Sequence, residues 1–345
     1  MLVIEINIKL NAKTYHNDSG ERMRALQLYG KMNDELQFIE SQLEQCMYSE
    51  NVDLNESSNH LLRAGGKRLR PVFVLISGQF GKYDIERLSQ IAVPLELIHM
   101  ATLVHDDVID NARTRRGQLT VKAKWDERIA MYTGDFIFGK ALTIASKLEH
   151  SEIHKILSKS VVQMVIGEIE QLRLLNNLDQ SIREYLLRIR RKTAILIAIS
   201  CQLGALASGA PEKIAQLLYS YGYNVGMAFQ IRDDILDMNG TEKQLGKPPG
   251  SDLKQGNITL PILYAIRDQQ TREIVKKALS KTDKEYEENL RKAILSIRAS
   301  SGIQQATVLS QRYIHKAISV LEKLPEIQAK KDLKLIANFI VDRAY

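Results

Sequence analysis

Proline, glycine, cysteine and tryptophan are all scarce in this sequence. Only 7 prolines and 19 glycines occur in 345 residues, and because these residues punctuate turns, their scarcity disfavours an all-β sandwich with a turn about every ten residues. The two cysteines, Cys46 and Cys201, lie far apart, so neither a disulfide framework nor a paired-cysteine metal site is available. Trp125 is the single tryptophan, and the sequence lacks zinc-finger and aromatic RNA-binding signatures, which argues against nucleic acid as a partner.

The composition is that of an ordinary globular protein with a basic surplus. Hydrophobic residues make up 44% and charged residues 26%, with a net charge of +7, which suits nucleic acid, a membrane surface or a small anionic substrate equally. Acidic Glu5 within the first apolar stretch makes the N-terminus a poor secretory signal. The uncharged run 194–211 is long enough for a marginal membrane span, but its polar and glycine residues favour a buried core helix. A soluble protein in a reducing cytoplasm is expected.

Apolar residues recur at three- and four-residue spacing along most of the chain, which predicts helices and no strand of any length. We expect one all-α domain over residues 21–345, with roughly ten or more helices, preceded by a disordered segment over residues 1–20. Pro71 falls in the first turn of a helix that follows the glycine pair Gly65-Gly66. The other helices are predicted at 21–50, 60–63, 85–110, 135–148, 152–174, 182–206, 214–238, 261–278, 284–298, 303–324 and 329–341.

A short acidic pattern occurs twice, each time at the polar end of an apolar stretch. Asp106 and Asp110 are four residues apart, as are Asp233 and Asp237, so each pair lies on one helix face and repels unless a cation sits between its members. Carboxylates in small number are the protein ligands that Mg²⁺ takes when it also holds a substrate's phosphates. A single such pattern is as well explained by an accidental acidic surface, but two of them favour a function.

Cationic residues accompany the acidic clusters. Each group alone is best explained as a solvated surface, whereas basic groups beside glycine-rich turns bind phosphate oxygens. Together with two metal-type carboxylate clusters they indicate a diphosphate substrate, and two diphosphates in all. The groups are Lys67, Arg68 and Arg70, then Arg115 and Arg116, then Arg190, Arg191 and Lys192, and finally Lys247 in the loop 239–260.

Six stretches of the sequence together resemble the trans-prenyl diphosphate synthase family. They extend over residues 60–265, most of the chain, and as a set they are highly specific. The sequence between these stretches is similar to the catalytic subunits of two-component bacterial enzymes that make heptaprenyl diphosphate, most clearly at 122–135, 167–171 and 200–210. The six stretches are GGKRLRP (65–71), LELIHMATLVHDDVID (95–110), RR (115–116), RRKTA (190–194), FQIRDDILD (229–237) and GKPPGSDLKQGNITLP (246–261).

The resemblance implies the isoprenoid synthase fold, with helices around a central apolar cavity, and it implies a role for individual residues. Residues that bind isopentenyl diphosphate would be Lys67, Arg70, His99 and Arg116. Residues that bind the allylic diphosphate would be Arg115, Lys192, Thr193, Gln230 and Lys247. The catalytic aspartates would be Asp106, Asp107, Asp110, Asp233, Asp234 and Asp237, of which Asp106, Asp110 and Asp233 are metal ligands. Asn257 departs from the family, which often has lysine there, and leaves that part of the allylic site open.

The resemblance also implies the chemistry and the partners. Two or three Mg²⁺ ions would assist ionisation of an allylic primer, farnesyl diphosphate, followed by condensation with isopentenyl diphosphate and loss of a proton. The product would be all-trans heptaprenyl diphosphate for the menaquinone side chain. A small non-catalytic subunit would complete a heterodimer, and membrane contact would be peripheral at most, during product release.

Small residues below the first aspartate cluster bear on product length. At about 1.5 Å per helical residue, Ala101 lies roughly 7–8 Å below Asp106, and Ile98 lies further down. In the family, an aromatic residue at the position of Ala101 stops the growing chain. Because Ala101 and Thr102 are small, the product is expected to exceed about three or four isoprene units, and seven units follow from the resemblance alone.

Three alternatives stay open at this point. One is a synthase of another product length, from hexaprenyl to octaprenyl. Another is a terpene cyclase or other prenyltransferase on the same helical scaffold, although cyclases usually lack the GGKRLRP and RR groups that this chain has. The last is a non-catalytic subunit, although such a chain would be free to lose its aspartates.

Overall fold

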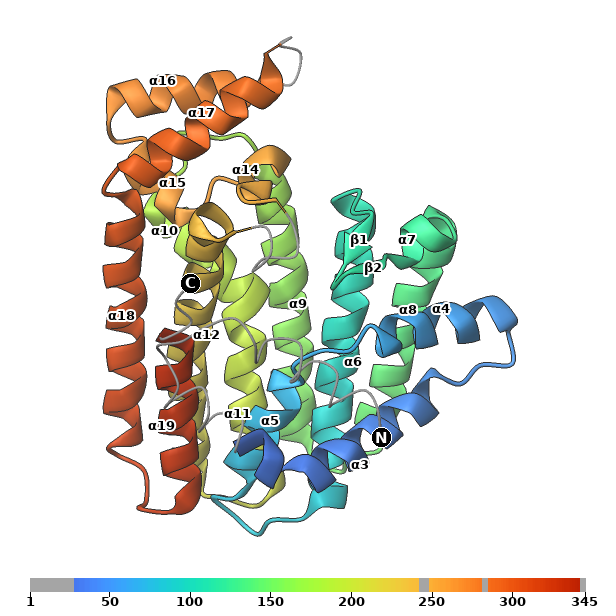
Figure 1. Cartoon of the computed structure of the whole chain (residues 1–345). Coiled ribbons are helices and arrows are strands. Elements are labelled where there is room, and N and C mark those ends of the chain that lie inside the picture. The colour runs from blue at the N-terminus through green and yellow to red at the C-terminus, as the bar shows by residue number, and fades with distance from the viewer. Residues whose placement is uncertain (1–27, 242–247, 281–284, 342–345) are drawn as a thin grey trace. The chain divides into compact units, whose positions relative to one another are not determined.

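The computed structural model describes residues 28–241, 248–280 and 285–341. The segment predicted to be disordered, 1–20, and the predicted phosphate ligand Lys247 lie outside these residues. Within them the chain is helical almost throughout (Figure 1). The helices are α3 (Asn33–Met47), α4 (Val52–Arg63), α5 (Leu69–Gly78), α6 (Ile85–Ile109), α7 (Val121–Lys124), α8 (Glu127–Ala145), α9 (Ser151–Arg173), α10 (Ile182–Ile189), the π-helical turn η1 (Arg190–Ala194), α11 (Ile195–Ala207), α12 (Glu212–Asn239), α14 (Ser251–Gln255), α15 (Leu260–Ala265), α16 (Gln269–Ala278), α17 (Tyr286–Ala299), α18 (Gly302–Leu321) and α19 (Gln328–Val341).

Side-chain caps explain where several helices begin. The Asp84 carboxylate accepts hydrogen bonds from the backbone N–H groups of Glu86 and Arg87 at 3.0 and 3.2 Å, which starts α6 at the predicted position. The predicted helix 261–278 is instead split into α15 and α16, because Asp268 accepts from the backbone N–H of Thr271 and begins a new helix. The predicted helix 182–206 is continuous but contains η1, which periodicity does not reveal.

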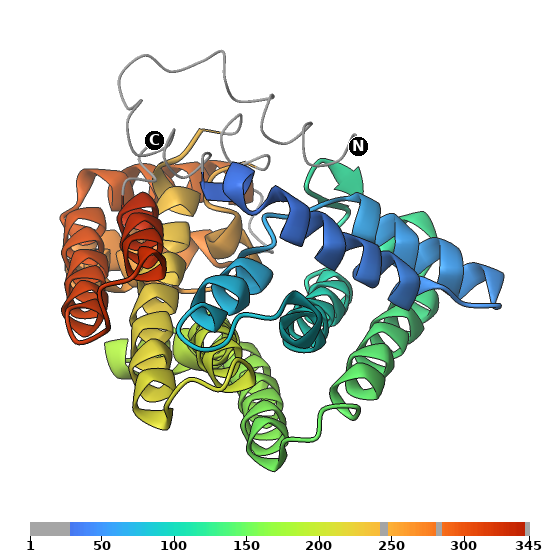
Figure 2. The ribbon, with the colours of Figure 1, turned by 90° about the horizontal axis from the view of Figure 1, so that it is seen from below.

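The described chain divides into two compact units. The first takes the chain up to Ile156, then Ser200–Tyr219 and Leu324–Phe339, and the second takes Leu157–Ile199, Ser220–Lys323 and the residues from Ile340 onward. The first unit is built around α6, which packs against α3, α5 and α8 and is seen nearly end-on among them in Figure 2. Because α6 is buried on all sides from Ile91 to Ile98 and buried or half-buried over most of the remaining length, it is a core helix.

The second unit has its own apolar core. Buried residues of α12, including Met227, Ile231 and Ile235, join residues of α10, α15, α17 and α18 in one cluster, and none of these three exposes any of its surface. α16 packs on α17, and α15 packs on α18. The core therefore surrounds the stretch of α12 that ends in the second aspartate cluster.

A short hairpin interrupts the helices of the first unit. Strands β1 (Thr114–Arg115) and β2 (Gln118–Leu119) pair antiparallel, with Arg115 opposite Gln118. The two residues between them, Arg116 and Gly117, both have positive φ, 53° and 78°, which is the pattern of a type I′ hairpin turn. The sequence showed no strand alternation here, because two-residue strands are too short to carry any. The turn places Arg116 at the tip of the hairpin.

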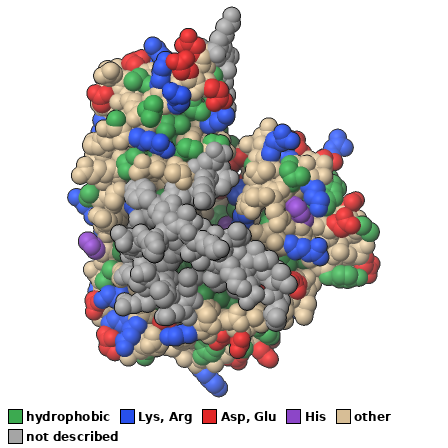
Figure 3. Space-filling model, viewed as in Figure 1, with side chains coloured by type: hydrophobic (Ala, Val, Ile, Leu, Met, Phe, Trp, Pro, Cys, Tyr) green, Lys and Arg blue, Asp and Glu red, His purple; other side chains and the backbone are tan. Residues whose placement is uncertain are grey.

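One helix of the described residues, α6, is long and apolar enough to cross a membrane, and 72% of its apolar window is buried inside the protein. A core helix passes the same test. The uncharged run 194–211 contains the shorter helix α11, whose residues are mostly buried, as expected for a core helix. On the face shown in Figure 3, lysine and arginine side chains are interspersed with acidic ones.

Candidate active site

The first aspartate cluster forms the C-terminal turn of α6. Asp106 and Asp110 are half-buried, whereas Asp107 is 2% exposed. Its Oδ1 atom accepts hydrogen bonds from Arg115 Nε at 2.8 Å and from Arg115 Nη2 at 2.7 Å. Burial raises the pKa of Asp107, and the Arg115 guanidinium opposes that rise. Asp107 therefore anchors the hairpin that carries Arg115 and Arg116, while its two neighbours lie nearer to solvent.

The second cluster lies at the end of α12 and divides in the same way. Asp233 is exposed, whereas Asp234 and Asp237 are 3% and 2% exposed. Asp237 accepts from Ser251 Oγ at 2.6 Å and from the backbone N–H of Asp252 at 3.1 Å, which ties α14 to α12. Each cluster thus contains carboxylates that bind neighbouring protein groups and at least one that is more accessible.

Both clusters lie at helix C-termini, where the helix dipole is negative. A carboxylate there costs roughly 0.3–1 kcal/mol unless a cation offsets it. Within the described residues no group of three or more histidine, cysteine or acidic side chains could hold a metal ion by itself. That arrangement fits Mg²⁺, which is usually bound by one or two carboxylates together with waters and substrate phosphates. The residues therefore fit a divalent cation that binds along with a phosphate-bearing substrate.

The first unit contains a cationic cluster in which Arg70 and His99 are half-buried and Arg116 keeps part of its side chain exposed. Burial, together with Arg116, lowers the pKa of Arg70 to about 10, while Glu96 opposes this. Burial also lowers the pKa of Arg116, and burial with the surrounding guanidinium groups lowers the pKa of His99 well below its ordinary value. The structure thus brings Arg70, His99 and Arg116 together, and His99 is a neutral side chain at neutral pH.

Gly66 leaves room for guanidinium groups beside this cluster. A Cβ atom on Gly66 would lie 2.8 Å from Arg116 Nη1 and 3.1 Å from Arg68 Nη1. The absence of a side chain therefore lets two guanidinium groups approach the backbone of the turn before α5. Repulsion among these cations makes the site favourable for an anion.

Arg68 is a buried anchor whose structural role the sequence did not reveal. It has a left-handed backbone conformation (φ 47°) at the start of α5. Its guanidinium donates to both carboxylate oxygens of Glu40, at 2.7 and 2.8 Å, and its Nη1 donates to Glu96 Oε1 at 3.2 Å. The two carboxylates outweigh burial and raise the pKa of Arg68. No local spacing could have predicted this, because Glu40 and Glu96 each lie 28 residues away.

In the second unit, the predicted allylic residues lie on η1 and α12. Lys192 Nζ donates to Glu168 Oε2 at 2.8 Å, and Arg191 donates to Gln163 Oε1 at 3.1 Å and forms an ion pair with Glu170. Thr193 Oγ1 donates to Gln230 Oε1 at 2.7 Å. The structure thus brings Thr193 and Gln230 into contact, and it holds Lys192 against α9.

The residues predicted to govern product length lie on α6. Ala101 and Ile98 are each 1% exposed, and Thr102 is half-buried and donates to the carbonyl of His99 at 2.8 Å. Their side chains belong to the core of the first unit. The helical spacing between Ala101 and Asp106 is as predicted, because α6 is unbroken between them.

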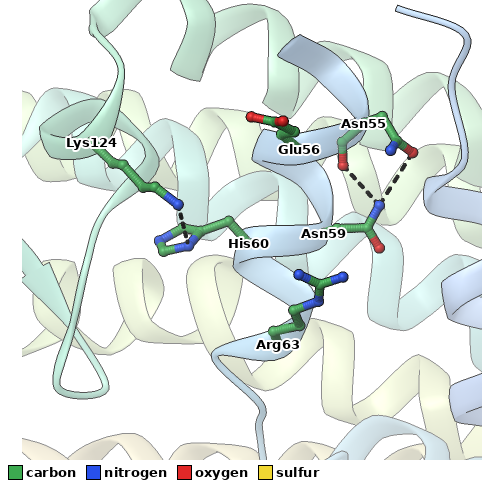
Figure 4. Close-up of a pocket in the computed structure, with 6 residues that line it drawn as sticks. All are labelled: Asn55, Glu56, Asn59, His60, Arg63 and Lys124. Carbon is green, nitrogen blue, oxygen red and sulfur yellow. Dashed lines mark hydrogen bonds between the residues drawn. The ribbon is translucent and has the colours of Figure 1, made fainter. Parts of the chain in front are cut away.

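A polar pocket of about 350 Å³ lies beside α4, lined by Asn55, Glu56, Asn59, His60, Arg63 and Lys124 (Figure 4). Lys124 Nζ lies 3.5 Å from His60 Nδ1, and His60 Nε2 lies 2.8 Å from the carbonyl of Leu119. His60 also borders a small cavity of about 10 Å³ that Asp107, Arg115 and Arg116 help to line. A pocket lined by polar and charged side chains does not suit a hydrocarbon chain, so it is no candidate for an isoprenoid tail.

Comparisons with known proteins show which family the chain belongs to. A model of the family described as polyprenyl synthetase matches residues 51–297. The chain is 50% identical to heptaprenyl diphosphate synthase component 2 of Geobacillus stearothermophilus, over 94% of this chain and 100% of that protein. It is 48% identical to the protein of the same name from Bacillus subtilis (strain 168), over 97% of this chain and 94% of that protein.

Solved structures are similar as well. A heptaprenyl diphosphate synthase from Staphylococcus aureus has a TM-score of 0.87 and 41% identity, covering 90% of this chain and 98% of that one. A polyprenyl synthase from Caulobacter crescentus, complexed with calcium and isoprenyl diphosphate, has a TM-score of 0.88 and 30% identity, covering 95% and 99%. These likenesses confirm the predicted all-α fold of the isoprenoid synthase type.

Proposed function

We propose that this chain, which belongs to the polyprenyl synthetase family, condenses isopentenyl diphosphate units onto farnesyl diphosphate to give all-trans heptaprenyl diphosphate. The observation that carries the proposal is the near-complete match, at 48–50% identity, to two proteins named for heptaprenyl diphosphate synthesis. Two intact aspartate clusters at the ends of buried helices support a catalytic subunit over a chain that only binds.

Asp106, Asp110 and Asp233 are the proposed Mg²⁺ ligands, for two or three ions in all. When bound, Mg²⁺ would offset the negative charge that develops on the departing diphosphate. A relative's structure with calcium and isoprenyl diphosphate supports this pairing of a divalent cation with the substrate class. Asp107, Asp234 and Asp237 belong to the same clusters, and their bonds to neighbouring groups support a role in holding Arg115, Gln230 and α14 in place.

The basic residues have two proposed tasks. Lys67, Arg70, His99 and Arg116 would bind isopentenyl diphosphate. Because His99 is neutral and surrounded by guanidinium groups, it would donate a hydrogen bond to a phosphate oxygen and would not act as a general base. Residues for the allylic diphosphate would be Arg115, Lys192, Thr193 and Gln230, with Lys247 a further candidate. Guanidinium groups pre-placed around the leaving diphosphate stabilise charge where it forms.

Ionisation of the allylic C–O bond leaves a carbocation, which the isopentenyl double bond attacks before a proton is lost. Such a cation needs dry apolar walls so that water does not capture it. Small Ala101 and Thr102 on α6 support a product longer than about four isoprene units. We assign seven from the relatives' names, and a hexaprenyl to octaprenyl product is the second candidate.

The names of the relatives, component 2, support a second subunit as partner for this chain. α9 offers a surface for it. From Val162 to Leu172 the exposed face of this helix is apolar, and we call Val162, Val165, Ile166, Ile169 and Leu172, which are 37–58% exposed, the α9 stripe. Glu168 and Glu170, in the same stretch, instead bind Lys192 and Arg191 within the protein.

An ordinary surface helix directs its apolar residues to the core, whereas α9 buries Ile153, Leu157 and Met164 and keeps the α9 stripe exposed as well. Contiguous exposed apolar patches mark interaction sites. We therefore assign the α9 stripe to the small non-catalytic subunit of a heterodimer. We further propose that the enzyme is cytoplasmic and contacts the membrane only peripherally. Its product would serve menaquinone side-chain synthesis.

The test is a condensation assay with purified chain, Mg²⁺, farnesyl diphosphate and labelled isopentenyl diphosphate, with and without the candidate second subunit. Product length is read by reversed-phase chromatography. A seven-unit product that requires the second subunit is expected, together with its loss in Asp106→Asn. Glu149→Gln, which removes an exposed acid elsewhere, serves as the matched control. A folded protein that makes no product under either condition would overturn the proposal.

A further inference from the structure

Tyr185 begins a chain of hydrogen bonds that is buried at the tyrosine end and reaches the half-buried Thr193. Its phenol, on α10, donates to Asp234 Oδ2 at 2.7 Å. The other oxygen of that carboxylate, Oδ1, accepts from Gln230 Nε2 at 2.8 Å, and Gln230 Oε1 accepts from Thr193 Oγ1 at 2.7 Å. Tyr185 is fully buried, so its side chain is out of reach of a substrate.

Each bond in this chain constrains the next one. The carboxylate of Asp234 can accept at both oxygens, and because Tyr185 holds Oδ2, rotation of the carboxylate about its Cβ–Cγ bond is blocked. Oδ1 is then directed at the amide nitrogen of Gln230, which leaves the amide oxygen to accept from Thr193. Both oxygens of this buried side chain are engaged, which makes Asp234 an effective anchor for the chain of bonds.

The backbone around Thr193 supports the same conclusion. Thr193 lies in η1, and single π-helical turns within α-helices occur frequently at functional sites. Gly226 of α12 packs directly against this turn, since a Cβ there would lie 2.6 Å from Ala194 Cα. Arg188 lies over the Tyr185 ring, 5.5 Å from its centroid, and donates to the carbonyl of Ile258 at 3.1 Å. Tyr185 is therefore held at both its ring and its hydroxyl.

We infer that Tyr185 is a positioning residue for the allylic diphosphate, acting through Asp234 and Gln230 to fix the orientation of Thr193. The inference rests on the proposed function, under which Thr193 and Gln230 contact that substrate. Loss of the phenol hydroxyl leaves Asp234 free to rotate and releases Gln230 and Thr193 from one orientation. Binding of the allylic substrate suffers, and binding of isopentenyl diphosphate does not.

The experiment compares Tyr185→Phe with Tyr221→Phe in the active enzyme, with its second subunit present where activity requires one. Tyr221 is a matched control because it is equally buried, lies on α12, and takes no part in the chain of bonds. We expect Tyr185→Phe to raise KM for farnesyl diphosphate about tenfold and to change KM for isopentenyl diphosphate less than twofold. The melting temperatures of Tyr185→Phe and Tyr221→Phe should be similar.

A Thr193→Ala background gives a second readout. If Tyr185 acts through Thr193, adding Tyr185→Phe there changes KM for farnesyl diphosphate less than twofold further. An active enzyme in which Tyr185→Phe raises both KM values alike, or matches Tyr221→Phe, would overturn the inference and leave the proposed function standing. An unsubstituted chain that makes no product with any partner would overturn both.

Discussion

The α9 stripe makes the second subunit's binding site testable one residue at a time. Ile169, at the centre of the stripe, exposes 54% of its surface. Full burial of such a side chain contributes about 1.5–3 kcal/mol, so covering the exposed half contributes about 0.8–1.6 kcal/mol. Ile169→Ser should therefore weaken binding of the second subunit about four- to fifteenfold. The double variant Ile169→Ser/Val165→Ser should weaken binding by roughly the product of the two single-variant factors.

Leu295 on α17 is the matched control, because it is also 54% exposed but is flanked by Arg291 and Lys292 and belongs to no apolar stripe. Both serine variants should lower the free energy of unfolding by similar amounts, about 0.7–1.4 kcal/mol, because the same fraction of each side chain is buried in the chain itself. The assay titrates the second subunit against a fixed concentration of chain, with activity and sedimentation as parallel readouts. Equal binding by Ile169→Ser and the parent chain, or equal weakening by Leu295→Ser, would refute the assignment.

Three further results are expected. Ala101→Phe places a ring about 7–8 Å below Asp106 on α6 and should shorten the product, as chromatography of the chain lengths will show; an unchanged length would contradict a growing chain that passes this point. His99 has a pKa well below 6.5 in the folded protein, so the unfolded chain binds the extra proton as pH falls through about 6.5 and stability is lost below that pH; denaturant melts from pH 7.5 to 5 should show a loss that His99→Gln reduces. Gly226→Ala should lower the melting temperature, because its clash with Ala194 costs about 1–3 kcal/mol against about 1 kcal/mol gained in helix propensity, whereas Gly139→Ala, with nothing within 4 Å of the added Cβ, should not.

The spacing of apolar and acidic residues predicted the features that depend only on near neighbours in the chain. These features are the helices and the placement of Asp106 with Asp110 at the end of one helix, because both follow from helical periodicity. The same spacing could not distinguish Asp106 from Asp107. Their difference in exposure depends on Arg115, which reaches back to Asp107 only because the type I′ turn reverses the chain.

Contacts between residues that are far apart in the sequence could not be predicted from spacing. The bond between Tyr185 and Asp234 joins residues 49 apart, and the pair of Glu40 and Glu96 around Arg68 spans more of the chain still. None of these residues stands out by type or periodicity. A buried tyrosine or glutamate acquires its role from its partner, and the partner is known only once the helices are packed.

Because η1 is a π-helical turn, the arrangement of the site depends on how many residues lie between α10 and α11, whatever their type. A π turn accommodates one residue more than an α-helix does, so removing one residue from Arg190–Ala194 would allow a regular helix from α10 into α11. The helix would close without a break and α10 and α11 would keep their relative phase, but the residues within the turn itself would point in different directions. Lys192 and Thr193 could not then both keep their partners. A deletion that makes the helix more regular would misalign the site, and a compensating insertion within the same turn should restore it.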